Sequence, residues 1–121
     1  MSIPPIAVAL LIGIVSGAVA ALCGVGGGII MVPFFVLLLG MPQKTAVATS
    51  LAAVVLTALL ASVKNHANQL IDWRIALPSG IAGAAVAWFA ADALRYLSNQ
   101  MLTKIFALVL ILVGLRMLFQ K

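Results

Sequence analysis

The sequence predicts an all-α integral membrane protein with four membrane segments, and three observations support this fold class. Hydrophobic residues make up 65% of the 121 residues, charged residues make up only 7%, and the mean hydropathy is +1.30. A water-soluble domain carries roughly 25% charged residues, so this chain cannot cover a surface that faces water. Its apolar runs are also long enough to cross the roughly 30 Å hydrocarbon core of a bilayer.

The first membrane segment is interrupted by the glycine cluster at residues 24–28. As one helix, residues 3–40 would reach about 57 Å, which is too long for one straight span and slightly short for two. Each glycine costs about 1 kcal/mol of helix propensity, so the helix is expected to break there. We therefore predict a helix over 6–23 followed by a half-helix over 29–39. Together they form either a single broken crossing or a re-entrant hairpin.

Three further apolar runs predict membrane spans over 45–63, 75–91 and 101–119. Asp72 is expected to N-cap the second of these helices, and Trp73 and Arg74 fit the headgroup level. Because the connections are short, residues 1–121 are expected to form a single transmembrane domain.

Small residues recur at four-residue spacing in two of the predicted helices. Such faces let helices approach closely in lipid, and we expect most of them to pack within one bundle. The two sets are Gly13, Gly17 and Ala21, and Ser79, Gly83 and Ala87.

The charges exclude several classes of function. The net charge is +5, but the cations are scattered singly, so no nucleic-acid partner is expected. The sequence contains no metal-ligand cluster, nucleophile–base pair or phosphate loop, so we expect no enzyme activity, no metal and no cofactor. Lys and Arg divide four against three between the two membrane surfaces, and a chain with so little bias can insert in both orientations.

The glycine cluster is the leading candidate for a substrate-binding site, through Gly24, Gly26, Gly27 and Gly28. Unwound backbone there can offer N–H groups, and the half-helix that follows points its positive dipole end at the break. Non-helical backbone at membrane depth survives only against protein or a water-filled cavity. The alternative is that the glycines only permit a tight hairpin and close packing.

Four side chains are further candidates, three for contact with the substrate and one for proton transfer. The hydroxyls of Thr49 and Ser50 could donate to an anion, or could instead bond to a carbonyl of the preceding helical turn. Cys23 could contact a sulfur-containing substrate or act as a small buried hydrophobe. His66, the only histidine, is a candidate proton relay, although its place in a polar loop also fits a residue at headgroup level.

Several of these motifs together resemble the TauE/SafE family of sulfite and organosulfur-anion exporters. The resemblance rests on the run Leu22–Gly28, then Val32-Pro33, then Ala48-Thr49-Ser50, and then Asp72-Trp73-Arg74. Typical members of that family resemble two such units in tandem, and this chain supplies one repeat unit.

The resemblance implies a transporter subunit for a small, sulfur-containing anion, such as sulfite or an organosulfur compound, in the cell (inner) membrane. It would work by alternating access as a dimer of half-units, either a homodimer, which could be antiparallel, or a pair with a sister half-transporter. Its expected partners are the lipid bilayer and the anion. Two alternatives stay open, namely a passive small-anion channel of the dual-topology dimer type and a non-transporting membrane assembly protein.

Overall fold

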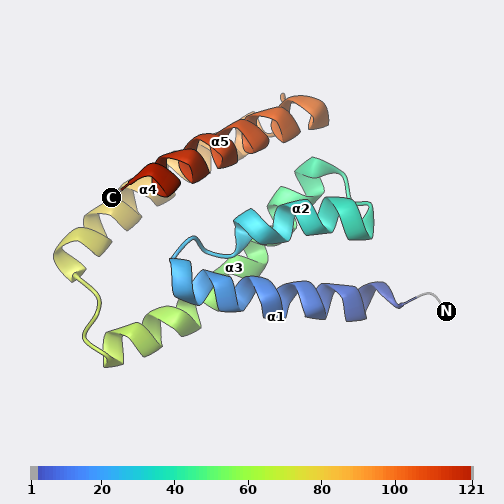
Figure 1. The fold of residues 1–121 in the computed structure, drawn as a ribbon. Coiled ribbons are helices and arrows are strands. Elements are labelled where there is room, and N and C mark those ends of the chain that lie inside the picture. Colours follow the sequence, from blue (N-terminus) through green and yellow to red (C-terminus); the bar gives the residue numbers. More distant parts are fainter. Residues whose placement is uncertain (1–2, 121) are drawn as a thin grey trace.

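The computed structural model describes residues 3–120, and every regular element in that range is an α-helix (Figure 1). The helices are α1 (Pro5–Cys23), α2 (Gly28–Leu39), α3 (Gln43–Ala67), α4 (Trp73–Ala93) and α5 (Asn99–Phe119). All except α2 are long and apolar enough to cross a membrane. The predicted fold class, all-α with four membrane segments, is therefore confirmed.

The helices α1 and α2 form an antiparallel pair joined by residues 24–27, which we call the glycine turn. Helix α1 ends where Gly24 adopts a left-handed conformation (φ 69°) and donates its N–H to the carbonyl of Ala20. Helix α2 begins after Gly27, which is also left-handed (φ 72°). The chain reverses there, so that α2 packs along α1 and ends near the beginning of α1 (Figure 1). Whether this pair is re-entrant in a bilayer stays a prediction.

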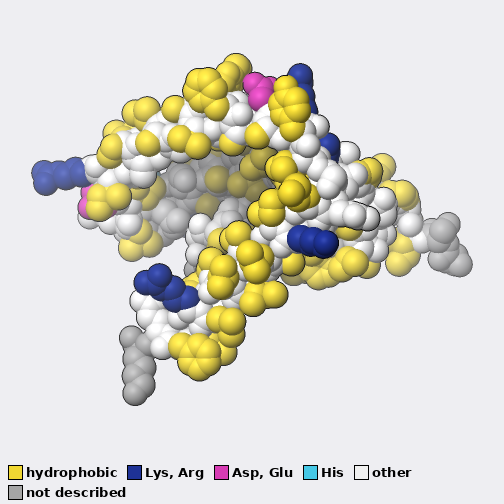
Figure 2. Space-filling model, turned by 90° about the horizontal axis from the view of Figure 1, so that it is seen from above, with side chains coloured by type: hydrophobic (Ala, Val, Ile, Leu, Met, Phe, Trp, Pro, Cys, Tyr) yellow, Lys and Arg dark blue, Asp and Glu magenta, His cyan; other side chains and the backbone are white. Residues whose placement is uncertain are grey.

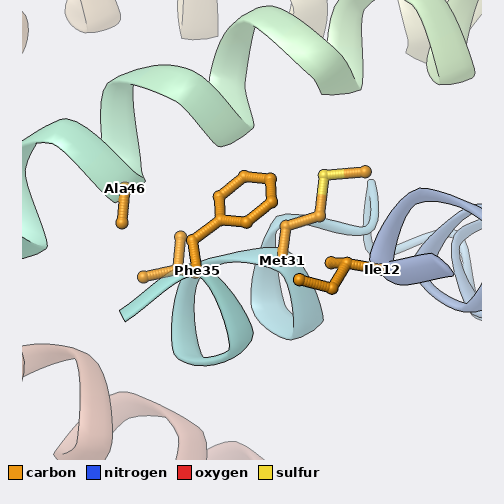
Figure 3. Close-up of a cluster of buried hydrophobic side chains, with 5 residues drawn as sticks. Ile12, Met31, Phe35 and Ala46 are labelled. Carbon is orange, nitrogen blue, oxygen red and sulfur yellow. The ribbon is translucent and has the colours of Figure 1, made fainter. Parts of the chain in front are cut away.

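The buried core lies where α1, α2 and α3 meet. Ile12 of α1, Met31, Val32 and Phe35 of α2, and Ala46 of α3 form one cluster (Figure 3). Phe106 of α5 packs against the edge of this cluster, and α5 contacts α3. The core therefore fixes α2 between α1 and α3, which holds the glycine turn against the middle of α3.

Helix α4 has no extensive contact with any other described helix, and each of its residues is exposed. A Cβ added at Gly83 would meet no atom within 4 Å, and the same is true of Gly13 and Gly17 on α1. The prediction that these small-residue faces pack within one bundle is therefore wrong. Lipid solvates an apolar helix as well as a neighbouring helix does, so nothing forces such faces together.

Helix α3 extends further at both ends than the span predicted from residues 45–63. As a result, His66 lies in the last turn of α3 and not in a polar loop. Helical conformation continues past the apolar run because the polar residues there can solvate their side chains outside the hydrocarbon core. The predicted N-cap is confirmed, because Asp72 Oδ1 accepts a hydrogen bond from the backbone N–H of Arg74 at 3.0 Å.

The surface matches a chain surrounded by lipid. Hydrophobic side chains spread over much of the visible face, and the few Lys and Arg side chains are scattered among them (Figure 2). Large apolar side chains on α3, α4 and α5 are more than half exposed, among them Leu60, Phe89 and Leu118. Such exposure would be costly in water and is ordinary in a bilayer.

Candidate anion-binding site

The glycine turn lies beside the middle of α3. A Cβ built on Gly26 would be 3.2 Å from Cγ1 of Val54, and one built on Gly28 would be 3.8 Å from Oγ of Ser50. Helix α3 has 25 residues and is therefore about 37 Å long. Because Val54 is near its centre, the turn sits about halfway along a helix that is long enough to cross the bilayer.

The glycine turn exposes a set of unpaired backbone donors. The N–H groups of residues 25–27 have no hydrogen-bond acceptor among the described residues, whereas the N–H groups of Ile30 and Met31 both bond to the carbonyl of Gly27. No side chain caps the N-terminus of α2. The first turn of a helix carries roughly half a positive elementary charge, so these donors form an electropositive patch.

Two of the glycines are required by the geometry of the turn. Gly27 is buried and left-handed, and a Cβ there would be 3.2 Å from the carbonyl oxygen of Ser16. Gly26 is also left-handed (φ 71°) and faces Val54 at the same distance. A left-handed conformation costs an ordinary residue about 1–2 kcal/mol before any clash is counted. This strain and these contacts explain why side chains are missing here.

The structure brings Ser50 close to the glycine turn but not Thr49. Ser50 is buried, and its hydroxyl donates to the carbonyl of Val47 at 2.8 Å. This bond is the backbone contact that was considered as the alternative to anion binding. To donate to an anion, the Ser50 hydroxyl would have to rotate away from the carbonyl of Val47. Thr49, one helical step away, is exposed on another face of α3. Cys23, the last residue of α1, is a free and exposed thiol.

A groove of about 500 Å³ runs from the glycine turn along α3 toward its C-terminal end. Gly17, Gly24 and Gly26 line one side of this α1–α3 groove, and Ala61 lines the other. Its polar side chains are those of Thr57, Ser62 and Asn65, which the sequence analysis missed.

A periodic signal in the sequence could have identified two of these polar residues. Ser50, Thr57 and Asn65 are spaced by seven and eight residues, which places them on one face of a helix with 3.6 residues per turn. Polar side chains that recur at that spacing inside an apolar span indicate a face that meets water or protein and not lipid.

A second groove, of about 310 Å³, lies on the other side of the turn between α3 and α5. Gly28 and Ser50 line its inner part, and Gln43 is its other polar residue. The rest of its lining is apolar, including Val47, Phe106 and others on α5. The glycine turn therefore separates a groove with a partly polar lining from one that is almost wholly apolar.

His66, the candidate proton relay, lies outside both grooves. Its Nδ1 accepts a hydrogen bond from Nε1 of Trp73 at 3.1 Å, and the two rings pack edge to face with centroids 5.4 Å apart. The pair ties the end of α3 to the beginning of α4.

These features define a class of protein. The chain is a multi-pass α-helical membrane protein in which two helices meet at a turn with free backbone N–H groups halfway along a third helix, and broken helices of this kind recur in membrane transporters. Residues 9–121 match the model of the sulfite exporter TauE/SafE family, and the chain belongs to that family. The resemblance in the sequence is thereby confirmed. The family comprises membrane transporters, which agrees with the prediction that the chain is not an enzyme.

Individual relatives carry matching names. The chain is 34% identical over 119 residues to the probable membrane transporter protein YunE of Bacillus subtilis (strain 168). The aligned residues make up 95% of this chain and 41% of that protein. This chain is 29% identical over 112 residues to a probable membrane transporter protein of Xylella fastidiosa (strain 9a5c), covering 90% of this chain and 42% of that protein. The chain thus spans less than half the length of these curated relatives. No solved structure matches it.

Proposed function

We propose that this chain is one unit of a membrane transporter for a small, sulfur-containing anion, and that the anion binds at the glycine turn. One observation carries the proposal: the backbone N–H groups of residues 25–27 are unpaired at a point halfway along α3. Unpaired N–H groups are costly in hydrocarbon, and an anion that accepts hydrogen bonds from several of them removes this cost. In this proposal Gly24, Gly26, Gly27 and Gly28 supply the backbone of the site.

Electrostatics support an anion over a cation as the substrate. The positive end of α2 faces the turn, and no charged side chain lines either groove. The whole sequence has two acidic residues, Asp72 and Asp92, and both lie near the ends of α4. Oxyanions such as sulfite accept several hydrogen bonds at once, so their geometry suits a row of backbone donors.

The complete transporter would contain a second unit. The chain spans about two fifths of the length of its relatives, and α4 is exposed along its whole length. We propose a homodimer, in parallel or antiparallel arrangement, or a pair with a sister half-transporter. Alternating access would then arise from rocking of the two units around the turns, as in transporters built from repeats. Of the four predicted side chains, Cys23 and Ser50 adjoin the glycine turn and stay in the proposal as candidate contacts, whereas Thr49 lies on another face of α3 and His66 lies outside both grooves.

The test is uptake of radiolabelled sulfite into liposomes that contain the purified chain. A transporter gives saturable uptake, a passive channel gives flux that does not saturate readily, and an assembly protein gives none. The decisive variant is Gly27→Ala, which forces a Cβ against Ser16, and its matched control is Gly13→Ala, where the added Cβ meets nothing within 4 Å. We expect Gly27→Ala to lose at least about tenfold in uptake, equivalent to about 1.4 kcal/mol, while Gly13→Ala retains it. Equal uptake by both variants, with both correctly inserted, would exclude the turn as the site.

A further inference from the structure

We infer that the α1–α3 groove is a water-filled access path that connects the glycine turn with the membrane surface at the C-terminal end of α3. As a path for substrate, this inference rests on the proposed function. As a path for water, it rests on the geometry alone. The groove begins at Gly24 and Gly26 and reaches Asn65, two residues before the end of α3.

The first argument concerns the backbone at the inner end of the groove. The unpaired N–H groups of residues 25–27 lie beside the middle of α3, so some polar partner has to reach them there. Irregular backbone at membrane depth is tolerated where it lines a water-filled cavity. Gly26 belongs both to the turn and to the lining of the groove, which makes the groove the direct supply of water to these donors.

The second argument concerns the walls of the groove. Its polar side chains lie along its length, and neither the amide of Asn65 nor the hydroxyl of Ser62 bonds to another described residue. These groups are free to bind water. The volume of about 500 Å³ holds on the order of ten or more waters, since each occupies about 30 Å³ in the liquid.

The third argument concerns the small residues of α1. Gly17 and Ala21 were expected to pack closely against another helix, but they line this groove, and a Cβ added at Gly17 would meet no atom within 4 Å. Across the groove, α3 presents Ala58 and Ala61, with Leu60 as the one large apolar side chain of the lining. Small side chains on both walls keep the space open, whereas larger ones at these positions would fill it.

Cysteine labelling tests the inference without requiring transport. In a Cys23→Ser background, single cysteines replace Ala61 on the groove wall, Asn65 at its mouth and Leu59 on the lipid-facing side of α3. Ala61 and Leu59 differ by only about 3 Å along the helix axis. A difference in their reactivity therefore reports which face of α3 is accessible to water, and not how deep each residue lies in the membrane. The probe is 2-sulfonatoethyl methanethiosulfonate, an anionic reagent that does not cross membranes, applied to liposomes that contain the full chain.

We expect Asn65→Cys and Ala61→Cys to react, and Leu59→Cys to react at least about tenfold more slowly, because a thiol in lipid stays protonated and unreactive. A second pair tests continuity: Thr57→Cys should also react, and adding Ala61→Phe should slow it by plugging the groove. Protection of Ala61→Cys equal to that of Leu59→Cys would overturn the inference. So would an oxidative cross-link between two chains through Ala61→Cys, because a second copy would then fill the groove.

The outcomes separate this inference from the proposed function. If the groove cysteines react while Gly27→Ala transports as well as the unmodified chain, the water path stands and the anion site fails. If Gly27→Ala loses uptake while Ala61→Cys is protected, the site stands and this route to it is wrong.

Discussion

The side-chain oxygen of Asn99, at the beginning of α5, accepts a hydrogen bond from the backbone N–H of Lys44, in the first turn of α3, at 3.2 Å. Helix α3 has no cap of its own, because Pro42 precedes it and offers no side-chain acceptor. A residue 55 positions away therefore caps it. The side chain of the same Lys44 makes a second contact. Its ammonium donates to the carbonyl of Arg95 at 3.3 Å, near the C-terminal end of α4. Three helix ends are thus joined at one point.

The first prediction concerns this remote cap. Replacing Asn99 with Ala leaves an N–H of α3 without its acceptor, and we expect a loss of about 0.5–2 kcal/mol in stability, as for other N-cap residues. Asn68→Ala is the control, because the side chain of Asn68 makes no hydrogen bond to another described residue. Unfolding by SDS titration in mixed micelles, followed by circular dichroism, measures both. Equal midpoints for the two variants would mean that the bond contributes nothing.

The second prediction concerns the core between α1, α2 and α3. Phe35 is buried and Phe34, its neighbour, is 42% exposed, so the two Phe→Ala variants change the same atoms in different surroundings. We expect Phe35→Ala to lose about 1–3 kcal/mol, which is below the 3–5 kcal/mol of water-soluble cores because lipid solvates the lost contacts in part. Phe34→Ala should be close to neutral in the same SDS titration. A larger effect at Phe34 would contradict the packing.

The third prediction concerns the charge of the substrate. The donors at the glycine turn supply only partial charges, and no charged side chain lines the grooves. The cost of removing an ion from water rises with the square of its charge, so a singly charged anion should bind better than a doubly charged one. We expect methanesulfonate to inhibit sulfite uptake about tenfold more effectively than sulfate does, which corresponds to about 1.4 kcal/mol. Stronger inhibition by sulfate would require a cation at the site.

The fourth prediction concerns the hydrogen bond between Trp73 and His66. In a Trp88→Phe background, Trp73 is the remaining tryptophan, and its fluorescence reports this contact. His66→Gln removes the ring that accepts from Nε1 of Trp73 and packs edge to face against it, so we expect the fluorescence emission of Trp73 to change in this variant.

The same His66→Gln variant tests the predicted proton relay. A relay predicts that uptake driven by a pH gradient falls several-fold. An anchoring role for the His66–Trp73 pair predicts that uptake is retained while the emission of Trp73 changes. We expect the second result, because Nδ1 is occupied by Trp73 and the ring lines neither groove.

The sequence by itself determined the membrane class, the approximate positions of the helices and the place where the first segment breaks. Each of these follows from properties that are local to the chain. Hydropathy depends only on composition, the break between Cys23 and Gly28 follows from the low helix propensity of glycine, and Asp72 was recognisable as an N-cap from its neighbours. Family membership was likewise visible in motifs whose spacing is fixed along the chain.

Only the tertiary structure decided which helix faces meet. The spans are apolar on all sides, so their patterns do not distinguish a face that meets protein from one that meets lipid. This is why Gly17 was expected to pack and instead lines a groove, why α4 was expected to join a bundle and is exposed, and why Thr49 and Ser50 could not be separated. In a bilayer, shape and hydrogen bonding select among such faces, and both depend on residues distant in the sequence, as the bond from Lys44 to Asn99 illustrates.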